Sequence, residues 1–205
     1  MLNKKTLVIY LVLSGITALV GLGQEKVPAE VTKWVVLESS NLRVDGSTNV
    51  NQFSCEIPAC TEVDTLIVSR RIAGKEVTLS GSIDLNIQSF DCHNNMMTRD
   101  LRKTLKEKQF PKLYIKFLSL NELPDMTGTP SPITGQIEIE IAGVRKHFEV
   151  NYHISMNAQQ QIQLLGERAI NFSDFNLIPP KRLAGLVRAK DKLKVEFHLN
   201  MKTIK

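Results

Sequence analysis

Four histidines and three cysteines are the side chains of this 205-residue chain best suited to metal binding or nucleophilic chemistry, and their spacing favours neither. His147 and His153 fall on one face of a predicted strand, but six residues of extended chain separate them by about 20 Å, too far to share a metal. Cys92 and His93 are adjacent, which is poor spacing for metal ligands. The sequence contains no Gly-x-Ser-x-Gly elbow, phosphate loop or dinucleotide fingerprint. We therefore expect no metal site, no cofactor and no catalytic function.

A disulfide is the alternative chemistry for the cysteines, because an exported protein can keep one. Cys55 and Cys92 occur in matching contexts, Phe-Ser-Cys and Phe-Asp-Cys. We predict a bridge between these two residues that leaves Cys60 free. The competing pair, Cys55–Cys60, would close the short loop between them, and spacing alone does not decide the connectivity.

The first 23 residues have the composition of a secretory signal peptide. A short basic region at residues 3–5 precedes an apolar run over residues 6–20, and small residues lead up to Gly23. The run is shorter than the roughly 20 residues of a membrane-spanning helix. We therefore expect cleavage, a periplasmic or secreted location and no stable membrane insertion. Residues 24–205 carry 24 basic and 21 acidic side chains, a formal charge of +3, which does not indicate a nucleic-acid partner.

The clearest secondary-structure pattern lies between residues 76 and 117. Every second residue from Val77 to Ile87 is apolar or glycine, which is typical of a strand with one dry and one wet face. A helix is predicted at about 96–108, where Met97, Leu101 and Leu105 form one apolar stripe. Pro111 prevents its continuation. Strand alternation then resumes at Leu113.

The same alternation recurs along the rest of the chain and predicts eight or nine long strands, mostly joined in hairpins. Asp45-Gly46-Ser47 is a turn signal, and a bulge is expected near Asn51. Two packed sheets would satisfy the pattern, but a closed barrel satisfies it better because it leaves no exposed edge. We predict one all-β domain at residues 24–205, an up-and-down antiparallel barrel of eight strands with one short helix. Such a barrel is either filled by side chains or holds one slim ligand.

The inward positions of this barrel are almost all aliphatic, which suits a hydrocarbon chain better than a sugar or a nucleotide. Gly81 and Gly166 lie mid-strand on the inward face, where they either leave room for a cavity or mark bends. Met97, Leu101 and Leu105 would close or gate one mouth. The candidate ligand-binding residues on the strands, for each of which plain core packing is the alternative, are Leu79, Gly81, Ile83, Leu85, Leu113, Ile115, Phe117, Phe148, Val150, Tyr152, Leu164 and Phe197.

Arg168 is the one charged residue that alternation places on the inward face. A lone inward charge is costly unless it is paired. One interpretation is that Arg168 meets an anionic head group near a barrel mouth. The alternatives are a bulge that turns it outward or a pairing with an interior acid. Because Tyr152 and Arg168 are almost the only polar inward residues, an enzyme acting inside the barrel is a less favoured function.

Several short motifs, in this order and spacing, resemble one known family. They are Trp34, the run Gly46-Ser47-Thr48-Asn49-Val50-Asn51-Gln52-Phe53, Gly81-Ser82-Ile83-Asp84, Met96-Met97-x-x-Asp100-Leu101, Phe110-Pro111, Gly135, Ile141-Ala142-Gly143-Val144 and Ser173-Asp174-Phe175-Asn176-Leu177. On these residues the chain resembles the YceI-like family of exported polyisoprenoid-binding proteins. The resemblance implies a lipocalin-like barrel in the periplasm, with a long isoprenoid lipid in its apolar interior. The family pattern usually has Gly where Asn176 stands, and often Arg where Phe172 stands.

These observations favour a periplasmic carrier for a polyisoprenoid or a similar long-chain apolar lipid. Binding would come from apolar burial, at roughly 0.8 kcal/mol per buried methylene. The first alternative is an envelope stress-related or partner-binding barrel with a filled interior, and the second is an enzyme on an apolar substrate. The sequence leaves open the chain length and head group of the ligand, the delivery partner and the oligomeric state, a dimer included.

Overall fold

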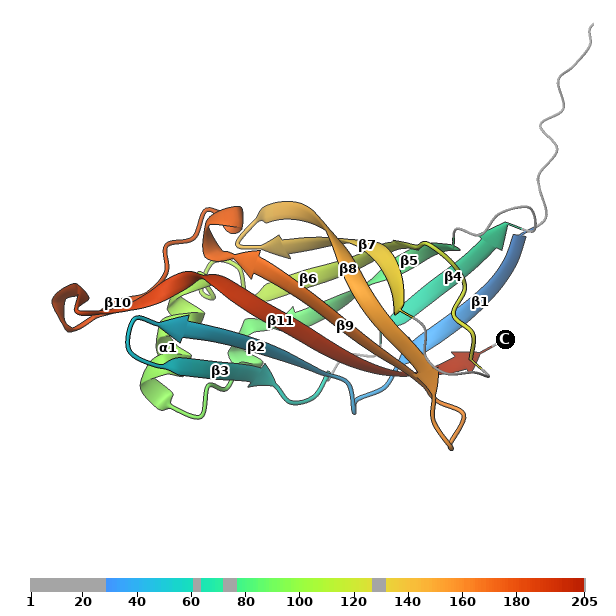
Figure 1. Ribbon diagram of the computed structural model, residues 1–205, viewed down its shortest axis with the longest axis horizontal. Helices are drawn as coiled ribbons and strands as arrows, with labels where there is room; N and C mark the ends of the chain where they lie inside the picture. Colours follow the sequence, from blue (N-terminus) through green and yellow to red (C-terminus); the bar gives the residue numbers. More distant parts are fainter. Residues whose placement is uncertain (1–28, 61–63, 72–76, 127–131, 205) are drawn as a thin grey trace, which may run out of the picture.

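The alternating apolar residues form the strands of a closed antiparallel barrel in the computed structural model (Figure 1). The structure describes residues 29–60, 64–71, 77–126 and 132–204, so the predicted signal peptide lies outside the described residues. Within them, eight strands follow one another around the barrel, and pairing of the last with the first closes it. In that order they are β1 (Ala29–Val36), β4 (Thr65–Arg71), β5 (Val77–Asn86), β6 (Lys112–Leu120), β7 (Pro132–Ile141), β8 (Val144–Met156), β9 (Ile162–Asn171) and β11 (Val187–Ile204). The predicted eight-stranded barrel is thus confirmed.

A hairpin of two further strands extends the wall beside β11. Strand β11 is 18 residues long, and one of its edges pairs with two other strands in succession. Its C-terminal part pairs with β1, and its earlier part pairs with β2 (Asn41–Thr48), which in turn pairs with β3 (Gln52–Ile57). Beyond β3, a single antiparallel bridge joins Glu56 to Asp91. The β2–β3 hairpin therefore forms the wall at the same end of the barrel as the helix (Figure 1).

The turn of this hairpin lies three residues later than the sequence suggested. Gly46 belongs to β2 and pairs with Phe53. A Cβ at Gly46 would lie 2.3 Å from the Phe53 ring, so the glycine makes room for a side chain and does not form a turn. The turn is made instead by Thr48, whose hydroxyl donates to Asn51 Oδ1 at 2.6 Å and accepts from Asn51 N at 3.0 Å. No bulge lies near Asn51.

Helix α1 (Asn95–Thr104) covers one end of the barrel. The Asn94 side chain accepts hydrogen bonds from Met96 N and Met97 N and so caps the start of the helix. The predicted end at residue 108 is wrong, because Lys106 adopts a left-handed backbone conformation with φ 56°, which ends a helix. The apolar stripe is confirmed, since Leu101 and Leu105 are buried under the helix.

Candidate functional site

The half of the barrel interior beneath α1 contains an enclosed apolar cavity of about 50 Å³. Leu101 and Leu105 form its roof, and the remaining lining side chains come from the strands and from Phe90. Ligand pockets usually measure 300–1,000 Å³, so this cavity alone does not hold a long lipid. The twelve lining residues, all apolar, are Leu42, Val44, Phe90, Leu101, Leu105, Leu113, Ile115, Ile139, Ile141, Ile170, Leu193 and Val195.

The other half of the interior contains a cluster of three aromatic rings among buried aliphatic side chains. The Phe197 ring lies 6.0 Å from the rings of both Phe117 and Tyr152, in edge-to-face arrangements. Gly166 makes room for this cluster, because a Cβ there would lie 2.3 Å from Phe197 Cζ. Gly81 marks a bend: the β5–β6 register shifts next to it, its φ is 152°, and a Cβ would lie 2.5 Å from the carbonyl oxygen of Thr65. The space beside both glycines is therefore occupied by the protein itself.

A second hollow, a groove of about 300 Å³, lies directly outside the helix-covered half. It runs between the β2–β3 turn, the first turn of α1 and the start of β11, and its lining is mostly apolar. Leu101 lines both this groove and the enclosed cavity. Because Leu101 lines both hollows, a movement of its side chain would change the shape of each. Other residues that line the groove are Val50, Phe53, Cys55, Met96, Met97, Phe172 and Val187.

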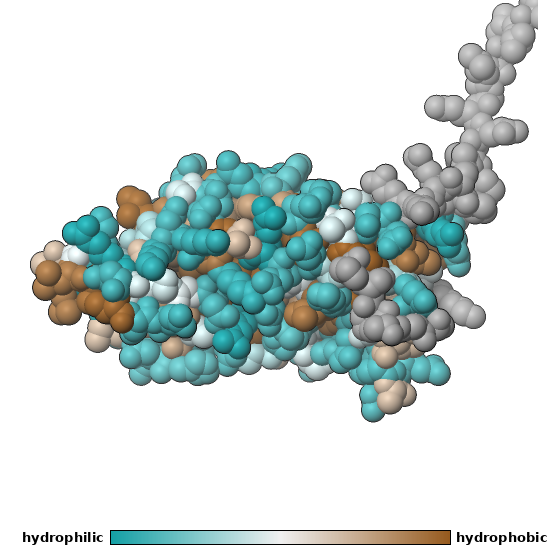
Figure 2. Space-filling view, in the orientation of Figure 1, coloured by the Kyte–Doolittle hydropathy of each residue, from teal (hydrophilic) through white to brown (hydrophobic). Residues whose placement is uncertain are grey.

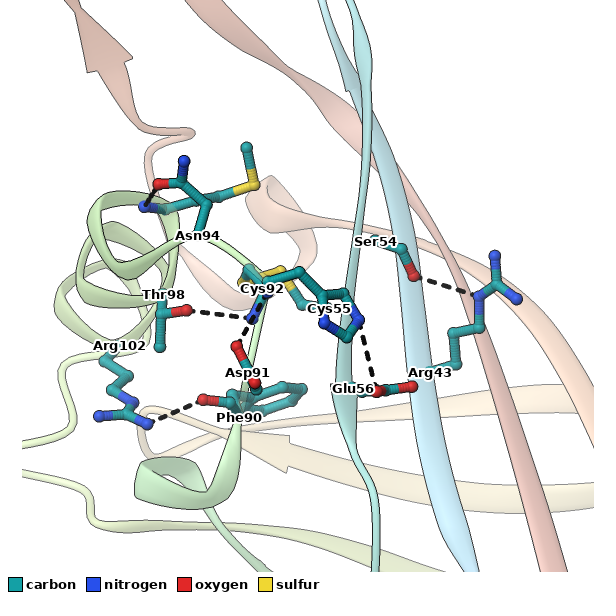
Figure 3. The surroundings of a disulfide bond; sticks show 12 residues. Arg43, Ser54, Cys55, Glu56, Phe90, Asp91, Cys92, Asn94, Thr98 and Arg102 are labelled. Carbon is teal, nitrogen blue, oxygen red and sulfur yellow. Dashed lines mark hydrogen bonds and ion pairs between the residues drawn. A yellow bond between two sulfur atoms is a disulfide. The ribbon is translucent and has the colours of Figure 1, made fainter.

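The helix is attached to the barrel by a disulfide and by polar contacts to the backbone (Figure 3). Cys55 of β3 is bonded to Cys92, just before the helix, as the sequence predicted. The Thr98 hydroxyl accepts a hydrogen bond from Cys92 N at 3.0 Å. The Arg102 guanidinium donates to the carbonyl oxygens of Gln88 and Phe90. Together with the Glu56–Asp91 bridge, these contacts attach the roof of the cavity to the barrel wall.

The groove is bordered on its far side by an arm that is attached to the helix. This arm consists of β10 (Lys181–Arg182), the 3₁₀ turn η4 (Leu183–Gly185) and the first residues of β11. Arg182 pairs with Asp100 of α1 and donates to the carbonyl oxygen of Met96 at 3.0 Å. The position of the arm therefore depends on the helix.

The residues proposed from the sequence lie in different parts of the interior. Leu101, Leu113 and Ile115 line the cavity, and Met97 lines the groove. Ile83 and Leu85 are buried beside them, opposite Ile115 and Leu113. Phe148 is half-buried. The others are packed in the core away from the cavity, namely Leu79, Phe117, Val150, Tyr152, Leu164 and Phe197.

Eight cavity-lining residues were not among the candidates, although seven of them lie in strands with alternating apolar residues. Alternation shows which side chains face inward but not how far along the barrel they lie, so no feature of the sequence separates them from the packed half. Phe90 lies outside the strands, so strand alternation gave no indication that it lines the cavity. The eight are Leu42, Val44, Phe90, Ile139, Ile141, Ile170, Leu193 and Val195.

Arg168 lies on the strand face that alternation predicted, because the β9–β11 register places it opposite Val195, but it is not buried. Its side chain is exposed, and its guanidinium carbon lies 5.5 Å from the centre of the Phe148 ring. A cation over an aromatic face is attracted by the ring quadrupole. This contact replaces the interior partner that an inward arginine would need. A role for Arg168 toward a head group stays a prediction.

Two reactive side chains are buried away from the groove. The free Cys60 thiol is buried, and desolvation together with the nearby Asp64 carboxylate raises its pKa to about 11. The thiol is therefore protonated and unreactive at neutral pH. Burial also raises the pKa of the Tyr152 hydroxyl, which has no hydrogen-bond partner among the described residues. Across those residues, no group of three His, Cys, Asp or Glu side chains is arranged to hold a metal ion.

In the described ranges, no helix has both the length and the apolar character needed to cross a bilayer.

An apolar barrel interior with a helical roof defines a class of small β-barrels, and comparison with known proteins identifies the family. Residues 30–201 match the YceI-like domain. The chain belongs to the YceI-like family. The Asn176 and Phe172 departures from the family pattern both occur around η3 (Phe172–Phe175), where Asn176 adopts the left-handed conformation, φ 55°, that glycine favours.

Solved structures confirm the fold. BcnA of Burkholderia cenocepacia is 16% identical with a TM-score of 0.56, over 78% of this chain and 95% of BcnA. A polyisoprenoid-binding domain from Saccharophagus degradans, implicated in plant cell wall breakdown, is 12% identical with a TM-score of 0.55, over 83% of this chain and 98% of that domain. No curated protein matches the chain.

Proposed function

We propose that the chain is an exported binding protein that holds a long isoprenoid, or a similar apolar lipid, in the helix-covered half of its barrel. The observation that carries this proposal is the pairing of a 50 Å³ cavity with a 300 Å³ groove, both of which are lined by Leu101. The wholly apolar lining of the cavity excludes a polar ligand there, because no side chain would satisfy its hydrogen bonds. Membership of the YceI-like family and a fold shared with a polyisoprenoid-binding domain support the same ligand class.

Binding requires the roof to move. The cavity is far smaller than a usual ligand pocket, whereas the groove reaches the lower end of that range. A lipid chain would therefore lie in the groove first and enter the interior by displacing Leu101 and Met97. Both are long, flexible side chains, and Met adapts well to irregular apolar shapes. The packed aromatic half would stop the chain from passing through the whole barrel.

Mass spectrometry of an organic-solvent extract of the purified protein tests the proposal. We expect an isoprenoid in near-stoichiometric amount from the wild type. Val195→Phe would fill the cavity and should lower the recovered lipid about tenfold or more, since several buried methylenes lose their site. Lys202→Phe, on the exposed side of the same strand, is the matched control and should retain the lipid. Equal lipid in both variants would contradict a site in this cavity.

A second candidate function is a barrel with a filled interior that binds a protein partner. The small volume of the enclosed cavity favours it. It predicts that extraction yields no lipid and that added isoprenoid leaves the midpoint of thermal unfolding unchanged. An upward shift of that midpoint with isoprenoid concentration would exclude it, because only a ligand of the native state stabilises in this way.

A further inference from the structure

Of the three most exposed large apolar side chains of the described residues, Leu183 and Leu186 lie on one projecting arm and Ile178 lies in the segment that leads to it. Ile178, Leu183 and Leu186 expose 77%, 71% and 75% of their surface. Figure 2 shows this apolar patch at the end of the molecule where β10 projects. Single exposed apolar residues are common, but a cluster on one protrusion indicates an interaction surface.

The arm is held in place, so these side chains are presented to solvent by a defined structure. Asn49, in the β2–β3 turn, donates to the Leu186 carbonyl oxygen at 2.8 Å and accepts from Arg188 N at 2.9 Å. The Arg188 side chain closes the tip by donating to the Gly185 carbonyl oxygen at 2.6 Å. Leu183 has a left-handed backbone, with φ 49°, which is uncommon for a residue with a side chain. Packing at the tip does not explain this conformation, because the Leu183 side chain is exposed.

Positive charge surrounds the apolar arm. Lys103, Lys106 and Lys181 line a groove together with Ile178, and all three are exposed and have no ion-pair partner among the described residues. Lys190 and Lys192 are also exposed, close to the base of the arm in β11. Of the nearby acids, Asp100 pairs with Arg182 and Asp191 accepts hydrogen bonds from Ser173, whereas Glu107 lines a groove together with Lys103 and Lys106.

From this arrangement we propose that the arm docks on the surface of an anionic phospholipid bilayer. Ile178, Leu183 and Leu186 insert at the boundary of head groups and acyl chains, and the lysines contact the head groups. The apolar side chains stand on a convex protrusion, a shape that enters a fluid interface without a complementary pocket. The positive charge of these lysines is complementary to that of an anionic surface. A protein partner or a second copy of the chain would have to receive this tip in a concave apolar site such as the groove, whereas a bilayer requires no such site.

Docking would place the groove against the bilayer, a consequence that rests on the proposed function. Val50, Met96 and Val187 line the groove at the base of the same arm. A lipid could then move between the bilayer and the groove with little exposure of its chain to water. The docking surface itself requires no lipid inside the barrel.

Co-sedimentation of the purified protein with vesicles tests the docking surface. We expect binding to vesicles containing about 30% phosphatidylglycerol, little binding to pure phosphatidylcholine, and weaker binding at high salt. The double variant Leu183→Ser/Leu186→Ser should bind about tenfold more weakly, because it loses two inserted side chains. The matched control is Val31→Ser/Met156→Ser, two exposed apolar residues on β1 and β8 away from the arm, and its binding should be unchanged.

The outcomes separate docking from the proposed function. Equal vesicle binding by the arm variant and the wild type would overturn the docking proposal, and so would no binding by the wild type. In the second case, light scattering that shows arm-dependent self-association would assign the patch to a second copy. If the wild type yields isoprenoid on extraction but does not bind vesicles, the docking proposal is wrong and the proposed carrier function stands. If the wild type binds vesicles through the arm but yields no lipid, the carrier function is wrong and the docking proposal stands.

Discussion

The two halves of the barrel interior are built by different means. In the half away from α1, aromatic rings interlock around Phe197, and Gly166 allows them to approach the wall. In the half beneath α1, aliphatic side chains surround a cavity whose roof is a helix attached by a disulfide and by a few side-chain hydrogen bonds. Close packing makes an interior resistant to rearrangement. The helix-covered half is therefore the part that can change shape while the barrel wall stays intact.

The largest expected effect comes from removing the covalent tie of the roof. Cys55→Ser/Cys92→Ser should lower the free energy of unfolding by about 3 kcal/mol, since the bridge closes a loop of 37 residues. If the halves differ as described, the loss of protection from amide hydrogen exchange will be greatest in α1 and smallest in β8 and β9. Exchange followed by mass spectrometry measures this distribution.

Cys60→Ser is the control for loss of a cysteine without loss of the bridge, since Cys60 is free. It should leave exchange in α1 unchanged. A uniform rise in exchange over the whole barrel after loss of the disulfide would contradict the independence of the two halves.

A smaller effect, of opposite sign in the two halves, is expected from adding one methylene. Val195 faces the cavity, so Val195→Ile should stabilise the fold by about 0.8 kcal/mol, the value of one buried methylene. Val150 is fully buried in the packed half, where Val150→Ile should cost about 1 kcal/mol through overpacking. Both substitutions keep the β-branched side chain that strands favour. Urea denaturation checks the signs, and two changes of the same sign would remove the distinction.

The contrast also shows which features were accessible from the sequence. Strand alternation predicted the barrel and the buried stripe of Leu101 and Leu105, because those patterns are local. The matching contexts of Cys55 and Cys92 suggested the correct bridge. The end of the helix was missed because it depends on the backbone conformation of Lys106, for which the sequence offers no glycine signal.

Features set by long-range packing were not accessible. Gly46 looked like a turn residue, whereas its role depends on the Phe53 ring of the neighbouring strand. The exposure of Arg168 was not accessible either, because alternation does not show that its side chain reaches the surface beside Phe148. The position of the cavity depends on register around the whole barrel, since Val195 and Val150 have equivalent patterns in their own strands.

An effect of similar size is expected at the Tyr152 hydroxyl of the packed half. The Tyr152 hydroxyl is buried without a hydrogen-bond partner among the described residues, and a buried unpaired hydroxyl is unfavourable by about 1–3 kcal/mol. Tyr152→Phe keeps the ring that packs on Phe197 and removes this cost, so it should stabilise the fold by roughly 1 kcal/mol. Tyr114→Phe, at a half-exposed position on the outer face, should change stability by less than about 0.5 kcal/mol. If Tyr152→Phe is less stable than the wild type, the hydroxyl has a hydrogen-bond partner in solution, and this half of the interior also has room for that partner. The two halves would then differ in degree only, and the packed aromatic cluster would no longer mark the inner limit of the proposed binding site.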